Sequence, residues 1–152
     1  MSRLGWIIGA VFVAGVGVFA WQTTQPAPEP TGHSMVTPDT SDLALGDPIA
    51  DVIVPESLSA DAQLGQRIFE TTCATCHGIN AAGQNGVAPP LIHTFYRPGH
   101  HSDEAFQMAA ANGVRSHHWN FGNMPRIEGV TRADVQYIAR YIREVQQANG
   151  IE

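Results

Sequence analysis

The chain has 152 residues, a formal net charge of −6 at pH 7, eight arginines and no lysine. This length predicts a single folded domain of ordinary size, and the acidic balance argues against a nucleic-acid-binding protein, which needs a basic surface. Six acids and no arginine fall in residues 22–56, whereas residues 57–152 contain eight acids and seven arginines. The acidity therefore belongs to the segment before residue 57, and the larger part of the chain is nearly neutral.

The first predicted element is an apolar helix near the N-terminus. Residues 4–21 are 18 residues without a charge, which as a helix would be about 27 Å long, close to the thickness of a bilayer's hydrocarbon core. Trp6 and Trp21 lie near its ends, where aromatic side chains favour the membrane interface. Arg3 precedes the run, so the positive-inside bias places the N-terminus in the cytoplasm. We expect residues 1–21 to anchor the chain in a bacterial cytoplasmic membrane.

A cleaved signal peptide is the alternative for the same segment. Val18-Phe19-Ala20 offers small residues at the positions that precede a cleavage site. The apolar run is longer than the usual core of such a peptide, about 7–15 residues, which favours the anchor. Either interpretation exports the remainder of the chain to the periplasm.

Residues 22–56 have the composition of a linker. They contain six prolines and six acids, too few apolar groups to offset the entropy of ordering, so we expect a largely disordered segment. Proline and like charges should extend it. Ile49–Val54 is more apolar, and the sequence leaves open whether it packs against the following domain.

The domain predicted for residues 57–152 begins with a helix. Ser57 and Ser59 are candidate N-caps, and the helix should continue to about Thr72 with Asp61 in its first turn. One apolar face has helical spacing and consists of Leu64, Ile68 and Phe69. Gly65 replaces a better helix former, which indicates that another helix passes close to the backbone there.

Two further helices are predicted. Ser102 should cap a helix that ends at about Asn112, before Gly113. The final helix has Thr131 and Asp134 in the arrangement of a capping box and ends at Asn149-Gly150. Its apolar stripe is regular and consists of Val135, Ile138, Ile142 and Val145.

The most informative motif is Cys73-Ala74-Thr75-Cys76-His77, which contains both cysteines of the chain. CxxCH is the attachment pattern of haem c: each thiol forms a thioether with the haem, and the adjacent imidazole can bind its iron. A thioredoxin-like motif would need a βαβ pattern, a structural zinc site would need more ligands, and a disulfide would not require His77. We therefore expect one covalent haem c held by Cys73, Cys76 and His77.

From about Ser57 onward the chain resembles a class I cytochrome c. The match rests, in order, on Gly65 in the first helix, the CxxCH motif, Ala88-Pro89-Pro90-Leu91, and Gly122-Asn123-Met124-Pro125 before a final helix that contains Tyr141. The resemblance implies an all-α fold with the first and last helices crossed and packed around the haem. It implies that Gly65 lets Tyr141 approach. It also implies that the Pro89 carbonyl accepts a hydrogen bond from the His77 ring, which would fix that ligand.

Met124 is the preferred candidate for the sixth iron ligand, opposite His77. It lies on a loop rich in glycine and proline, whereas Met1 and Met35 lie outside the domain and Met108 falls within a predicted helix, where methionine more often fills the core. A His/Met pair raises the reduction potential relative to two histidines. Ligation by His117 or His118, or an open sixth position, are the alternatives.

Five further histidines have no role in this scheme: His93, His100, His101, His117 and His118. Imidazoles suit copper and zinc, so a peripheral site for a second metal is conceivable. We favour exposed loop residues or partners of the haem propionates, because adjacent residues rarely both reach one ion.

These observations predict an electron carrier rather than an enzyme. The partners would be the membrane, a respiratory donor, and a terminal oxidase or reductase as acceptor. A haem-based sensor of small ligands or a peroxidase-like enzyme is the first alternative, and it requires a displaceable sixth ligand. The second is a haem subunit of a larger oxidoreductase.

Overall fold

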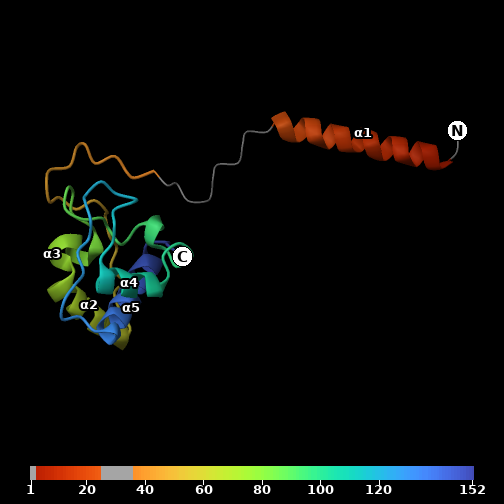
Figure 1. Ribbon diagram of the computed structural model, residues 1–152. Helices are drawn as coiled ribbons and strands as arrows, with labels where there is room; N and C mark the ends of the chain where they lie inside the picture. Colours follow the sequence, from red (N-terminus) through yellow and green to blue (C-terminus); the bar gives the residue numbers. More distant parts are fainter. Residues whose placement is uncertain (1–2, 25–35) are drawn as a thin grey trace. The chain divides into compact units, whose positions relative to one another are not determined.

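The computed structural model describes residues 3–24 and 36–152, and the chain separates into two units, residues 1–32 and 33–152 (Figure 1). Met1, Met35 and residues 25–35 of the expected linker lie outside the described residues. The helix of the first unit is α1, Arg3–Thr24. Its Gly5–Thr24 span is long and apolar enough to cross a membrane, a property that N-terminal signal sequences share.

The second unit is helical, and the described part of the chain contains no strand, only two isolated bridges. The structure confirms the three predicted helices: α2 (Ala60–Thr72), α4 (Asp103–Asn112) and α5 (Arg132–Ala148). Three short elements were not predicted: α3 (Ala74–His77), η1 (Ile79–Ala81) and η2 (Thr94–Tyr96).

Local capping explains where the long helices begin and end. Of the two candidate N-caps of α2, Ser59 is the one used: its hydroxyl accepts from the Ala62 N–H. At α5, Thr131 and Asp134 form the predicted capping box, in which each side chain bonds to the other residue's backbone. Gly113 ends α4 with φ at +74°, a conformation that glycine adopts without strain.

Helices α2 and α5 cross at Gly65. A Cβ atom on this glycine would lie 1.9 Å from the carbonyl oxygen of Tyr137 and 3.0 Å from the nitrogen of Ile138. The resemblance had implied that Gly65 makes room for Tyr141, and this was wrong in detail: Gly65 makes room for the α5 backbone. Tyr141 packs one turn farther along, against Phe69, with the ring centroids 5.7 Å apart.

The core lies along this crossing. All four predicted apolar residues of α5 are buried, namely Val135, Ile138, Ile142 and Val145. The buried face of α2 differs from the predicted one, because Leu64 and Ile68 are only half-buried. Phe69 is buried as predicted, and Ile68 packs against the edge of the core. Ala62 and Gly65 are buried beside Phe69, since the close approach of the two backbones favours small residues at the crossing.

The C-terminal part of the expected linker is attached to the second unit, which differs from the prediction of disorder. Backbone bonds join Gly46 to Asn85 and Ile49 to Ala82, and the Asn149 side chain bonds both backbone groups of Ile53. Two acids of this segment also stabilise local turns. The carboxylates of Asp39 and Asp47 accept hydrogen bonds from the backbone N–H groups of Ser41 and Ala44. These long-range hydrogen bonds order a segment whose composition alone would predict disorder.

We predict that Gly65→Ala lowers the free energy of unfolding by about 3 kcal/mol or more, the upper end of the cost of overpacking a core. The added methyl group would meet backbone atoms of α5, which cannot move without separating the helices. Urea unfolding of the full-length protein in detergent, followed by circular dichroism, measures the effect. Gly99→Ala is the control, because its nearest neighbour would be 3.9 Å away, and equal stability of the two variants would contradict the prediction.

Candidate cofactor site

The CxxCH residues form one helical turn directly after α2. Cys73 ends α2 through a bond from its N–H to the Phe69 carbonyl, and the N–H groups of Cys76 and His77 return to the Cys73 carbonyl at 3.1 and 2.9 Å. Both thiols are free; Cys73 is half-buried and Cys76 is exposed. Burial raises the pKa of Cys73 to about 11, which makes it a poor thiolate and disfavours a thiol–disulfide role.

His77 is buried and its ring is fixed. Its Nδ1 lies 2.8 Å from the Pro89 carbonyl oxygen, and because a carbonyl only accepts, Nδ1 carries the proton and donates. This is the bond that the resemblance implied. Burial lowers the pKa of His77 and outweighs the opposite effect of the Pro89 bond. The ring is therefore neutral at pH 7, with a lone pair on Nε2 that suits a metal ion.

The loop after His77 folds back beneath it. The Gln84 side-chain amide donates to three consecutive carbonyls of the motif, those of residues 74, 75 and 76, at 3.3, 2.8 and 3.1 Å. The Gly83 N–H bonds to the His77 carbonyl at 2.7 Å. A Cβ on Gly83 would lie 2.4 Å from the Pro90 nitrogen. This close approach brings Pro89 within reach of the His77 ring.

Met124 lies on a separate segment, 47 residues after His77. Its N–H and carbonyl both pair with Val114, at 2.9 Å each, and it is half-buried. Gly113 permits this pairing, because a Cβ there would lie 2.5 Å from the Met124 carbonyl oxygen. The structure thus gathers Cys73, Cys76 and His77 in one turn and fixes the backbone of Met124 elsewhere.

Three of the unassigned histidines gather in one place. One ring nitrogen from each of His100, His101 and His118 lies within 4.8 Å of the others. Burial is the main reason that the pKa values of His101 and His118 are lowered, and neighbouring histidines add to it. His93 is separate: its Nδ1 accepts from the Phe95 N–H. The ring nitrogens of the adjacent residues His100 and His101 lie close together, in a turn where the N–H groups of both bond to the Arg97 carbonyl.

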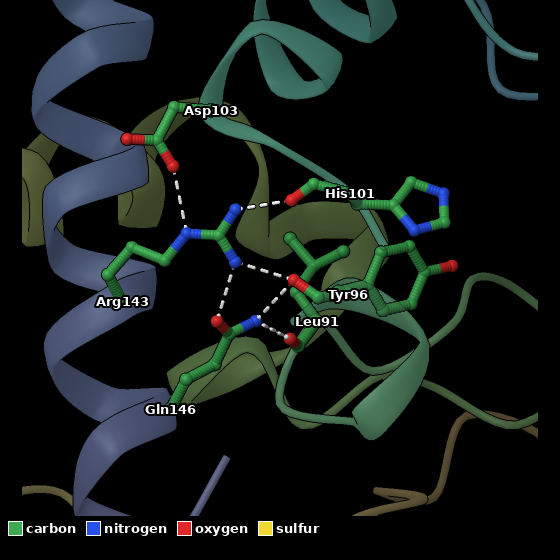
Figure 2. Close-up of polar contacts among 6 residues, drawn as sticks. All are labelled: Leu91, Tyr96, His101, Asp103, Arg143 and Gln146. Atoms are coloured by element: carbon green, nitrogen blue, oxygen red, sulfur yellow. Dashed lines mark hydrogen bonds and ion pairs between the residues drawn. The ribbon is translucent and has the colours of Figure 1, made fainter. Parts of the chain in front are cut away.

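A buried polar network on α5 holds this region, and the sequence analysis missed it (Figure 2). Arg143 donates from Nε to Asp103 at 2.8 Å, from Nη1 to the Tyr96 carbonyl at 2.6 Å, and from Nη2 to the His101 carbonyl. Gln146, which is fully buried, donates to the Leu91 and Tyr96 carbonyls at 2.9 and 3.0 Å. The available signal in the sequence was the position of Arg143 and Gln146, two polar residues beside the apolar stripe of α5.

Taken together, the donor set fits a covalently attached haem c. Two unpaired thiols stand in one turn with a buried, neutral imidazole whose remaining nitrogen is available to iron. Four thiolate or imidazole ligands for a structural zinc ion are not grouped there.

The comparisons with known proteins agree with this interpretation. A family model described as cytochrome c matches residues 62–146. The chain is 35% identical over 65 residues to the cytochrome c of Theileria parva, an alignment that covers 43% of this chain and 54% of the relative. It is 31% identical over 98 residues to the cbb3-type cytochrome c oxidase subunit CcoP of Rubrivivax gelatinosus, covering 61% of this chain and 30% of that subunit.

These alignments span about half or less of the length of the curated relatives. No solved structure matches the chain significantly.

We predict that Gln84→Ala lowers the free energy of unfolding by about 1–2 kcal/mol, because three carbonyls lose their shared donor. Gln84→Glu should cost at least as much at pH 7, since a carboxylate cannot donate to them. Urea unfolding of the full-length protein checks both. The control is Gln136→Ala on the exposed face of α5, and a loss no larger than in this control would contradict the role given to Gln84.

Proposed function

The chain belongs to the cytochrome c family, and on that premise we propose that it is a membrane-tethered carrier of single electrons in a respiratory chain. The cytochrome c domain implies a covalent haem c, and we assign its thioether bonds to Cys73 and Cys76. When bound, this haem supplies a one-electron Fe(II)/Fe(III) couple. The observation that carries the proposal is the buried His77 ring with Nδ1 committed to the Pro89 carbonyl.

We assign His77 and Met124 as the residues that would bind the haem iron. The Pro89 bond fixes both the orientation and the tautomer of the His77 ring, which would keep this ligand in place. Two backbone hydrogen bonds to Val114 fix the backbone that carries the Met124 side chain. Met108 is a poor alternative, because it is 52% exposed on α4. A soft thioether favours the reduced iron and raises the potential.

His118 is a weaker candidate for the sixth position. Its Nε2 lies 3.3 Å from that of His100, and its ring stacks on Phe95 with the centroids 4.7 Å apart. His117 is exposed, and its Nδ1 bonds to the Arg115 carbonyl at 2.9 Å. A ring nitrogen of each histidine therefore has another partner, which supports Met124.

The proposed location of the carrier is the periplasmic face of the cytoplasmic membrane. We propose that residues 1–21 anchor it, that residues 22–56 connect it, and that residues 57–152 hold the haem on the periplasmic side, as the position of Arg3 favours. Tethering raises the effective concentration of the carrier near membrane-bound partners. The similarity to an oxidase subunit supports a terminal oxidase as the acceptor. It also supports the second candidate function, a haem subunit within such an oxidase.

Ligand sensing or peroxidase chemistry requires that the sixth ligand leaves the iron. If Met124 holds this position, the reduced protein should resist carbon monoxide. Rapid and complete binding of carbon monoxide would instead favour a sensor or a peroxidase.

We predict that Met124→Ala abolishes the weak far-red absorption of a ferric iron–thioether bond. Met124→His should lower the reduction potential, because imidazole replaces thioether. Absorption spectroscopy and a redox titration of the oxidised full-length protein measure both effects. Met108→Leu is the matched control and should leave the spectrum and potential unchanged. A far-red band that persists in Met124→Ala would exclude Met124 as the ligand.

We predict that the haem stays in washed membranes and that respiration depends on it. Reduced-minus-oxidised spectra should show a c-type haem in membranes of cells that make the full chain. Replacing residues 1–21 by a cleavable signal peptide should release the haem to the soluble periplasmic fraction. Deleting the chain should slow electron flow to oxygen or another terminal acceptor, and an unchanged respiratory flux would refute the carrier role.

A further inference from the structure

We propose that His100, His101 and His118 form a binding site for a divalent metal ion of the zinc type, distinct from the haem iron. These residues come from two segments on either side of α4. One ring nitrogen from each lies within 4.8 Å of the others. Neutral imidazoles are suitable ligands for Zn²⁺ and Cu²⁺.

The spacing of two of the ring nitrogens matches a tetrahedral ion. Zn–N bonds of about 2.0–2.1 Å at a tetrahedral angle place neighbouring ligand nitrogens about 3.3–3.4 Å apart. The Nε2 atoms of His100 and His118 are 3.3 Å apart. These two nitrogens share one hydrogen, and an ion that displaces it can bind both nitrogens with little movement of either ring.

The third ring is held in the tautomer that a metal ligand needs. His101 Nδ1 lies 2.5 Å from the Phe95 carbonyl oxygen, so Nδ1 donates its proton and Nε2 keeps its lone pair. A histidine that binds metal usually donates its other N–H in this way.

The backbone that carries these rings is fixed before any ion binds. The N–H groups of His100 and His101 both bond to the Arg97 carbonyl, at 3.0 and 2.8 Å. Arg143 holds the His101 carbonyl and also Asp103, just beyond the pair (Figure 2). A site assembled on such a frame loses little side-chain freedom when it binds.

Among the residues that the structure describes, no fourth ligand atom joins the three nitrogens that converge. His117 lies beside the site, with its ring centroid 4.2 Å from that of His118, but its nitrogens are not among the three that converge. The Asp103 carboxylate is engaged by Arg143. His100 is exposed, so an ion bound here would remain accessible to water or to a ligand from a partner protein.

Zinc titration of the full-length holoprotein tests the proposal. The protein is purified in detergent without a polyhistidine tag, stripped with a chelator, and titrated with Zn²⁺ by calorimetry. We expect one Zn²⁺ per chain, and X-ray absorption at the zinc edge should show imidazole nitrogens at about 2.0–2.1 Å. His100→Asn and His118→Asn should each weaken binding by about tenfold or more, at least the loss seen when an outer-shell partner is removed.

His117→Asn is the matched control, and its affinity should stay close to that of the wild type. The haem absorption should be unchanged in all three variants, which separates this site from the axial ligands. Wild-type binding no tighter than that of a His100→Asn/His118→Asn double variant would overturn the proposal. An equal loss in His117→Asn, or a change of the haem spectrum in His118→Asn, would overturn the assignment of these three ligands.

Discussion

The close contact between the backbones of α2 and α5 at Gly65 and Tyr137 is the constraint on which the rest of the domain depends. Helix α2 ends at the residue where the CxxCH turn begins, so the crossing fixes the origin of that turn. Helix α5 supplies Arg143 and Gln146, whose side chains hold the carbonyls of the loop opposite. A change at the crossing would therefore displace both the CxxCH turn and the histidine cluster.

Much of this domain follows from short-range sequence patterns. Capping residues such as Ser59 and Thr131 define helix ends because their bonds reach only three residues along the chain. The apolar stripe of α5 has the helical period, and its four predicted residues are buried. CxxCH is informative for the same reason, since its chemistry is contained in five consecutive residues.

The features that were missed depend on residues far apart in the sequence. Which tyrosine of α5 meets Gly65 depends on the register of two helices about 70 residues apart, and periodicity does not determine it. The attachment of Ile53 to Asn149 crosses 96 residues, so the linker composition gave no sign of it. The meeting of His100 with His118 likewise requires the fold of the intervening helix, whereas the adjacency of His100 and His101 argued against a shared site.

The hydrogen bonds that attach residues 46–53 to the domain also shorten the part of the linker that lies outside the domain. A chain free up to residue 57 would gain about 36–40 Å of extended length over one that is free only up to residue 46, at about 3.3–3.6 Å per residue. The attached segment meets the domain beside Asn85, in the loop that folds beneath His77. Under the proposed membrane anchoring, the shorter linker would confine the domain to a smaller area of membrane than a linker free up to residue 57.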